Sequence, residues 1–312
     1  MDHLFHLTPE TLFLRRDALA FGHDDRELAR SLRAGVIVRV RHGAYCSAVV
    51  WRNLDEVGRY LLRCKAVMLV HRERVALSHT SAAVAHGLEL FRPDLTHVHV
   101  VRLDGGNAAV RGDITYHAPR WTPEDLYWDG HRLLVTPTLA ALGTASLHDV
   151  LSGVVVVDSL LHHGLAELGE VVETFKRRGH HPHSRRLQLV VRLTRPGAES
   201  VLETLLRMLF WRHQIPEPEL QFKVWSDDGV LLARVDFCWP EHELLGEADG
   251  RMKYGRSLLP GQDPAEVVYA EKRREDLVRE QTQMRMIRFV HDDLARPRET
   301  TRRTRRMLGL AA

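Results

Sequence analysis

The hydrophobic pattern near the N-terminus predicts two short helices in succession. The first begins at Thr8, which can cap it, has Pro9 at its first position, and continues through Phe13 to a stop near Gly22. The second occupies residues 24–35, because two aspartates open it and a glycine closes it.

The second helix carries arginines at i, i+4 and i+7, a spacing that aligns side chains in one stripe: Arg26, Arg30 and Arg33. A strand then follows at residues 36–41, with a turn at His42-Gly43. Its alternation sorts the side chains into two sets, Val36, Val38 and Val40 on one side and Ile37, Arg39 and Arg41 on the other.

Two helices followed by a basic hairpin are typical of a winged helix-turn-helix. We expect the arginine stripe to enter the major groove of double-stranded DNA, with Arg39 and Arg41 on phosphate. The alternative is a small helical cap whose arginines are solvated. The segment ELARSLRAGVIVRVRHGAYC also resembles the N-terminal domain of AbiEi-type antitoxins, which implies a winged helix that binds the promoter of its own operon.

The middle of the chain predicts alternating strands and helices. Residues 96–103 alternate as a strand, residues 104–107 form a turn, and residues 113–118 form a returning strand. Helices are expected from Pro137 and over residues 154–164. The stretch SHTSAAVAHGL is similar to the segment that follows the winged helix in AbiEi-like proteins.

From residue 198 the pattern predicts an amphipathic helix and then a three-stranded meander. The strands are expected at residues 222–225, 231–239 and 243–249, with a hairpin turn at residues 227–229. A helix over residues 264–281 and a short strand over residues 284–290 complete the segment.

Composition narrows the class of protein. Hydrophobic residues make up 44% of the 312 residues, which excludes disorder as the main state. The net charge of +3 is too small for a uniformly basic coat, although six arginines gather after Ala295 in a basic tail that can hold phosphate. No apolar run is long enough for a bilayer, and three widely spaced cysteines indicate a reducing, cytoplasmic compartment. The 20 histidines include a cluster at residues 180–183 that lacks carboxylate or thiolate partners for zinc.

Acidic residues gather on the predicted meander. Period two places Arg234, Asp236 and Cys238 on one face of the second strand, and Glu243, Leu245, Glu247 and Asp249 on one face of the third. If Asp236 lies opposite Glu247, the carboxylates converge and Glu203 reaches them from the preceding helix. Such oxygen ligands suit Mg²⁺ or Mn²⁺, and Lys253 supplies a cation for a phosphate transition state.

This order resembles the PD-(D/E)XK nuclease superfamily, in particular its branch related to very-short-patch-repair endonucleases, over residues 198–296. The resemblance rests on RVDFCWP, LLGEADGRMKY and EKRREDLVR. It implies that Asp236, Glu247 and Glu203 bind the metal and that Asp249 and Lys253 belong to the catalytic set. Val235 replaces the name-giving proline, and Asp249 stands where the lysine belongs, with Lys253 four residues on.

The sequence thus predicts an α/β (α+β) protein in parts: a winged helix-turn-helix (residues 1–50), an AbiEi-like α/β middle domain (51–190), a restriction-endonuclease-like domain (198–296) and the basic tail (297–312). The expected function is Mg²⁺- or Mn²⁺-dependent cleavage of DNA directed by the winged helix. The alternative is a non-catalytic antitoxin and transcriptional autorepressor with a degenerate nuclease fold and a toxin partner encoded nearby. No membrane partner is expected, and the oligomeric state stays open.

Overall fold

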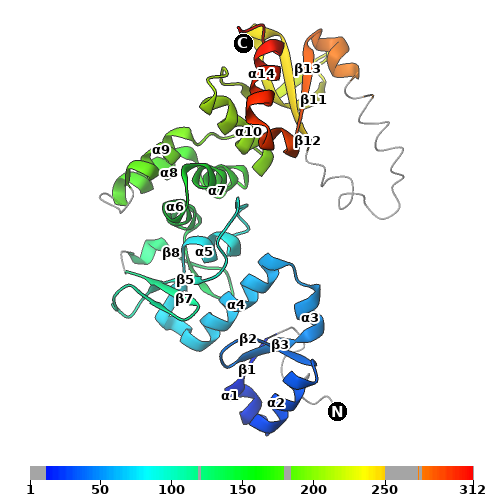
Figure 1. Cartoon of the computed structure of the whole chain (residues 1–312). Coiled ribbons are helices and arrows are strands. Elements are labelled where there is room, and N and C mark those ends of the chain that lie inside the picture. The colour runs from blue at the N-terminus through cyan, green and yellow to red at the C-terminus, as the bar shows by residue number, and fades with distance from the viewer. Residues whose placement is uncertain (1–11, 119–120, 179–183, 250–272, 274–275, 312) are drawn as a thin grey trace.

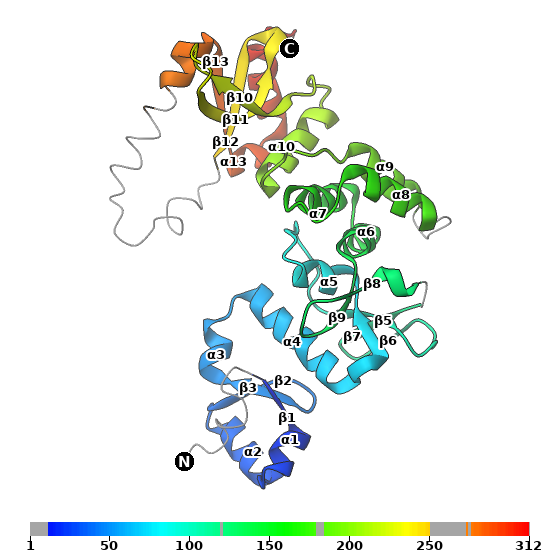
Figure 2. The same cartoon turned by 180° about the vertical axis from the view of Figure 1, so that it is seen from behind.

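The computed structural model describes residues 12–118, 121–178, 184–249, 273 and 276–311. It is a mixed α/β protein, and the strands of these residues form three sheets that follow one another along the chain (Figure 1). Figure 2 shows the same order from behind, with the helices α6 to α9 between the second and third sheets. Among the described residues, none of the helices combines the length and the apolar character needed to cross a membrane.

The N-terminal part is a three-stranded antiparallel sheet of order β1-β3-β2 with three short helices. Its elements are β1 (Phe13–Leu14), α1 (Arg15–Ala20), α2 (Asp25–Arg33), β2 (Ile37–Arg41), β3 (Ala44–Ser47) and α3 (Ala48–Asn53). The predicted start of α2 is confirmed, because Asp24 caps the helix and accepts the Glu27 N–H at 2.7 Å. The single helix expected through Phe13 is wrong: this residue pairs with Tyr45 of β3, and Thr8 lies outside the described residues.

Both faces of this small sheet are covered. Ile37 packs with Leu28 of α2 on one face, whereas Val40 packs with Leu62 of the following helix α4 on the other. The predicted alternation of β2 therefore holds for Ile37 and Val40, which are buried on opposite faces, whereas Val36 is exposed. The sheet consequently packs directly onto the middle of the chain through α4.

The middle part is a six-stranded mixed sheet of order β6-β7-β5-β4-β9-β8. Its elements are α4 (Glu56–His71), η2 (Arg72–Arg74), β4 (Val75–Leu77), α5 (His79–Ala85), β5 (Val98–Arg102), β6 (Ala109–Arg111), β7 (Ile114–His117), η3 (Pro123–Asp125), β8 (Leu126–Trp128) and β9 (Leu133–Val135). The expected antiparallel return after residues 96–103 is wrong, because β7 runs parallel to β5. The short strand β6 reverses the chain first and pairs antiparallel with β7.

Four helices then pack around one another and against this sheet: α6 (Pro137–Leu147), α7 (Val150–His162), α8 (Leu168–Arg178) and α9 (Ser184–Leu193). The predicted helices at Pro137 and over residues 154–164 are confirmed by α6 and α7. The histidine cluster at residues 180–183 lies outside the described residues.

The C-terminal part is a four-stranded sheet of order β10-β11-β12-β13. Its elements are α10 (Val201–Arg212), β10 (Glu219–Trp225), β11 (Leu231–Trp239), η4 (Pro240–His242), β12 (Leu244–Asp249), β13 (Arg285–Val290), α13 (His291–Ala295) and α14 (Pro297–Met307). The predicted meander is confirmed: β10, β11 and β12 are antiparallel neighbours, and β13 then runs parallel to β12. Of the helix expected over residues 264–281, only residue 273 and residues 276–282 are described, and they are helical.

The sheet separates two hydrophobic clusters. Leu206 of α10 packs with Phe237, Phe289 and Leu308 on one face, and Val278 packs with Cys238 and other residues on the opposite face. The basic tail is part of this fold, because α14 buries Thr300 and Thr304 beneath its arginines. Its exposed arginines are Arg296, Arg298, Arg302 and Arg306.

Candidate functional site

Two carboxylates from different elements meet where α10 faces the C-terminal sheet. Ser200 caps α10, and the Glu203 carboxylate folds back over this helix end, accepting the Ser200 hydroxyl at 2.7 Å and the Glu199 N–H at 2.9 Å. The amide of Gln221 on β10 donates to Glu203 at 2.9 Å and to Asp236 on β11 at 3.4 Å. Gln221 thus holds the two carboxylates side by side.

The pleat of the sheet is interrupted at this point. Gln221 has φ = +53°, a left-handed conformation that costs free energy for a residue with a side chain. The flanking pairs of the β10–β11 ladder are Leu220 with Phe237 and Phe222 with Val235, so Gln221 lies across from Asp236. Because strained residues are frequent at functional sites, the contact of Gln221 with the two carboxylates is a candidate site.

This interruption corrects the predicted faces of β11. The side chains of Asp236 and Phe237 both lie on the face of the sheet that α10 covers. Gln221 donates to Asp236 and also to Glu203 of α10, and Phe237 packs against Phe210 of the same helix. Cys238 packs in the opposite cluster with Val278, so it does not share a face with Asp236. Strict alternation fails because the left-handed residue on the neighbouring strand shifts the pleat.

Burial and charge change the acidity of Glu203. The side chain is buried, with 6% of its surface exposed. Burial, followed by the nearby negative charge of Asp236, raises the pKa of Glu203 to about 7. This carboxyl therefore exchanges its proton near neutral pH, as a group in a reactive site does.

Glu247 and Asp249 extend the acidic surface along β12. The β11–β12 ladder ends with the pair of Phe237 and Gly246, and beyond it the Asp236 carboxylate accepts the Ala248 N–H at 2.8 Å. Gly246 faces Phe237 and Phe289, so the side chain of the next residue, Glu247, leaves β12 on the opposite face of the sheet, with Leu245. It is buried, and its carboxylate lies 3.6 Å from the Arg288 guanidinium on the parallel strand β13. Asp249 ends β12 half-buried, and Lys253 lies outside the described residues.

The acidic side chains of this region can be compared with the oxygen ligands that a divalent cation requires. Within the ranges that the structure describes, no group of three or more His, Cys, Asp or Glu side chains is arranged to hold a metal ion. The pair of Glu203 and Asp236 nevertheless suits Mg²⁺ or Mn²⁺, because both supply hard oxygens and a cation would relieve the repulsion that raises the pKa of Glu203.

The predicted DNA-contacting arginines divide into two groups. Arg26, Arg30 and Arg33 are exposed on α2, and Arg39 is exposed on β2 with its guanidinium 6.0 Å from the centre of the Tyr45 ring. Arg41 instead donates to Asp113 at 2.9 Å, with 13% of its side chain exposed. This ion pair joins the hairpin to the middle sheet, so Arg41 serves the junction between the two parts.

We call the group of Glu203, Gln221, Asp236, Glu247 and Arg288 the acidic site. The sequence analysis missed two of these residues, Gln221 and Arg288. Gln221 lacked any motif, although the hairpin turn at residues 227–229 already sets it near Asp236. Arg288 meets Glu247 only through the parallel pairing of β13 with β12, which follows a long intervening segment and has no local signal.

Comparison of the chain with protein-family models finds no matching family, and comparison with curated proteins finds no match. The resemblances to AbiEi-type antitoxins and to PD-(D/E)XK nucleases therefore remain expectations from the sequence.

The raised pKa of Glu203 predicts a specific pH dependence of stability. Since the pKa is about 7 against an ordinary value of 4.5, folding favours the protonated form. This contribution is complete below the ordinary value and is lost as the pH rises through about 7. The side chain of the variant Glu203→Gln cannot ionise. The free energy of unfolding of the variant, relative to that of the wild type, should therefore rise by roughly 3 kcal/mol between about pH 5 and about pH 8.

Urea unfolding of both proteins across this pH range measures the difference, in which the shared titrating groups cancel. Glu217→Gln is the matched control, because Glu217 is exposed and lies outside the acidic site. Parallel pH profiles for the wild type and Glu203→Gln would show that the carboxyl titrates normally.

Proposed function

We propose that this chain is a DNA-binding protein with a metal-dependent DNA endonuclease site centred on the pair of Asp236 and Glu203. The observation that carries the proposal is the contact of two carboxylates through the strained Gln221, with one of them poised to exchange a proton near neutral pH. Acidic side chains gathered on a sheet in this way suit phosphodiester cleavage with Mg²⁺ or Mn²⁺.

The topology around the site supports this proposal. A helix, three antiparallel strands, a helical segment and a strand parallel to the third follow one another in the order that the PD-(D/E)XK resemblance implies. Asp236 lies on the second strand and Glu247 on the third, as that resemblance requires. This correspondence concerns the order of elements and the placement of two acids.

The residues of the chain would divide the work. Asp236 and Glu203 would hold the metal, and a bound Mg²⁺ would supply Lewis acidity and charge neutralisation at a scissile phosphate. Gln221 orients both carboxylates by donating to each. Glu203 accepts or releases a proton according to whether a cation offsets the charge of Asp236. Asp249 at the end of β12 would add negative charge beside the metal.

The wild-type protein should nick supercoiled plasmid DNA in the presence of Mg²⁺ or Mn²⁺ and should stop when EDTA removes the ion. The substrates include methylated, mismatched and single-stranded DNA, because the sequence preference is unknown. Absence of cleavage on every substrate, at protein concentrations that saturate DNA binding, would contradict the proposed activity.

The exposed arginines of α2 support DNA binding by the N-terminal part. Replacing Arg26, Arg30 and Arg33 together with alanine should weaken binding to duplex DNA and reduce the salt slope by up to about two to three, since each cation removed from the DNA interface lowers counterion release by up to about 0.9. Gel-shift titrations at several salt concentrations measure both quantities.

The matched control is the triple variant Arg111→Ala, Arg185→Ala and Arg212→Ala, because these three side chains are exposed and lie outside both the N-terminal part and the basic tail. Equal affinity and equal salt slope for the α2 variant and the wild type would show that α2 does not contact DNA.

A second function, a non-catalytic DNA-binding antitoxin or autorepressor, is favoured by one observation. The Arg288 guanidinium lies 3.6 Å from the Glu247 carboxylate, and such a pairing can replace a metal as the partner of a buried acid. Under this function the protein binds its promoter and a partner toxin through a degenerate nuclease fold. It would bind DNA through α2 without divalent ions and would show no cleavage.

A further inference from the structure

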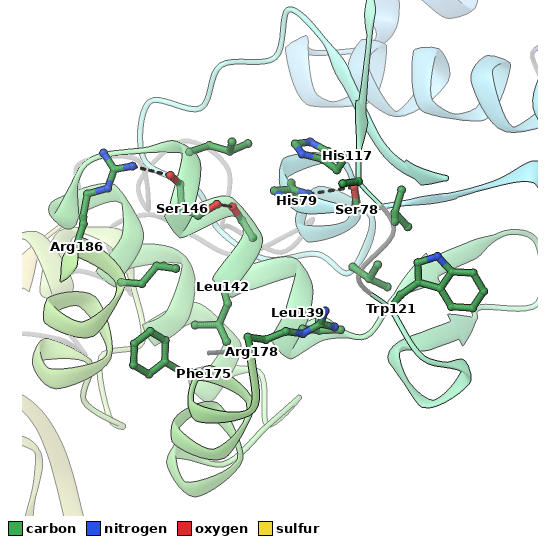
Figure 3. A pocket seen from close by; sticks show the side chains of 16 residues that line it. Ser78, His79, His117, Trp121, Leu139, Leu142, Ser146, Phe175, Arg178 and Arg186 are labelled. Atoms are coloured by element: carbon green, nitrogen blue, oxygen red, sulfur yellow. Dashed lines mark hydrogen bonds between the residues drawn. The ribbon is translucent and has the colours of Figure 1, made fainter. Parts of the chain in front are cut away.

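The middle part of the chain contains a cavity of about 650 Å³, which lies between the mixed sheet and helices α6, α8 and α9. Its volume falls in the range of small-molecule sites, about 300–1,000 Å³. Figure 3 shows two opposed walls, one with His79 and His117 and the other with Leu142, Phe175 and Arg186. The cavity is far along the chain from the acidic site and shares no residue with it.

The first wall is built from stacked histidine rings. His79 and His117 stack with their ring centres 3.5 Å apart and their planes within 14°. His117 also lies within hydrogen-bond distance of His99, at 2.9 Å, and burial lowers the pKa of His99 to about 4. His99 is therefore neutral at physiological pH, and the wall behind the cavity is flat and aromatic.

The backbone is strained to present this wall. His79 is the first residue of α5 and has φ = +47°, in the left-handed region. Gly143 of α6 makes room for its ring, because a Cβ at that glycine would approach the ring within 3.1 Å. The backbone of His79 is therefore strained at the first residue of α5, and Gly143 leaves room for its ring. Strained residues of this kind are frequent at ligand sites.

The second wall supplies a positive charge. The Arg186 guanidinium donates to the Ser146 carbonyl at 2.6 Å, while its Nε is buried without an acceptor among the described residues. Arg178 also lines the cavity, but its guanidinium is held by the buried Asp125 at 2.8 Å, a carboxylate that also accepts Arg177 at 3.1 Å. Arg186 is therefore the cation best placed to receive an anionic group.

Apolar side chains complete the site. Leu139, Leu142 and Phe175 face the histidines from the helices, and Trp121 closes one end in Figure 3. The Trp121 indole N–H donates to the Arg102 carbonyl at 3.0 Å, which fixes the ring at that end. A ligand that fills this space must therefore combine a flat apolar body with one anionic group.

We propose that the cavity binds a small aromatic or heteroaromatic anion, with its carboxylate or phosphate on Arg186 and its ring against the histidine wall and Phe175. An oxygen of the anion would pair with the Arg186 guanidinium, and the ring would fill space that is apolar on one side and aromatic on the other. This site is independent of DNA cleavage, so it stands whether or not the acidic site is catalytic.

The test uses 8-anilinonaphthalene-1-sulfonate, an aromatic anion whose fluorescence rises in apolar surroundings. The full-length wild type should bind it saturably, and Arg186→Gln should weaken binding by at least about tenfold, since a hydrogen bond to a charged group contributes about 1.5–3 kcal/mol. Arg186→Lys should restore part of the affinity. Arg185→Gln is the matched control, because this neighbouring arginine is exposed and does not line the cavity.

Two further measurements identify the chemical class of the ligand and test whether the probe binds in this cavity. Displacement of the probe by salicylate indicates an aromatic carboxylate, and displacement by adenosine monophosphate indicates an aromatic phosphate. Leu142→Trp should fill the cavity and abolish binding, with circular dichroism confirming that the variant is folded. Equal binding by the wild type and Arg186→Gln, or failure of both competitors to displace the probe, would overturn the proposal.

Discussion

Asp236→Asn should abolish Mg²⁺-dependent nicking of plasmid DNA while leaving DNA binding unchanged. Asp236 contacts Gln221 and the Ala248 N–H, so its carboxylate is held in place for a metal. Asparagine keeps the size of the side chain but removes the negative charge. Loss of the Lewis acid and of charge neutralisation costs several kcal/mol, so we expect a rate reduction of about 1,000-fold or more.

The controls separate a loss of chemistry from a loss of fold. Asp228→Asn makes the same change in the exposed hairpin turn between β10 and β11 and should cleave like the wild type. Glu203→Gln should have a milder effect that additional metal partly restores, because the glutamine keeps a side-chain oxygen that can still bind the metal. Full activity of Asp236→Asn would remove this residue from the catalytic set.

Of the single substitutions proposed here, Arg207→Ala should lower the free energy of unfolding the most. Arg207 of α10 donates to Asp158 of α7 at 2.6 Å, and both side chains are almost completely buried. Asp158 also accepts the Thr204 hydroxyl and the Arg195 N–H, each at 3.0 Å. Removing the guanidinium leaves a buried carboxylate without its cation, which costs about 3–5 kcal/mol.

Chemical unfolding followed by circular dichroism measures this cost as a lower midpoint. Glu217→Ala breaks the exposed pair with Arg195 and should leave the midpoint close to that of the wild type. The double variant Asp158→Leu with Arg207→Met should recover much of the lost stability, because a buried ion pair can be replaced by apolar residues. A midpoint for Arg207→Ala equal to that of Glu217→Ala would contradict the structural role of the pair.

The elements of the C-terminal part could be predicted because their signals are local. A Ser200 cap opens α10, and the turn at residues 227–229 sets the hairpin between β10 and β11. The antiparallel pairing of β11 with β12, with Phe237 opposite Gly246, follows from these signals. The same reasoning missed Gln221, because its left-handed backbone depends on how β10 meets α10 and not on its neighbours in sequence.

Predictions in the N-terminal and middle parts were wrong where one local sequence pattern is compatible with two structures. Phe13 fits a helix by hydrophobic spacing, yet it forms a strand because β3 offers a pairing edge. Residues 113–118 were a strand as expected, but β6 intervenes and turns an expected antiparallel return into parallel pairing with β5. Arg41 resembles a phosphate ligand in sequence, whereas Asp113, 72 residues later, becomes its partner in the fold.

Anomalous diffraction from crystals soaked in Mn²⁺ tests the central claim most directly. The account predicts a peak between the carboxylates of Asp236 and Glu203, and no peak at this position in Asp236→Asn crystals. Binding of the ion should also lower the pKa of Glu203 below its present value of about 7. A map without a peak, with Arg288 still beside Glu247, would contradict the metal-dependent nuclease and favour the non-catalytic repressor.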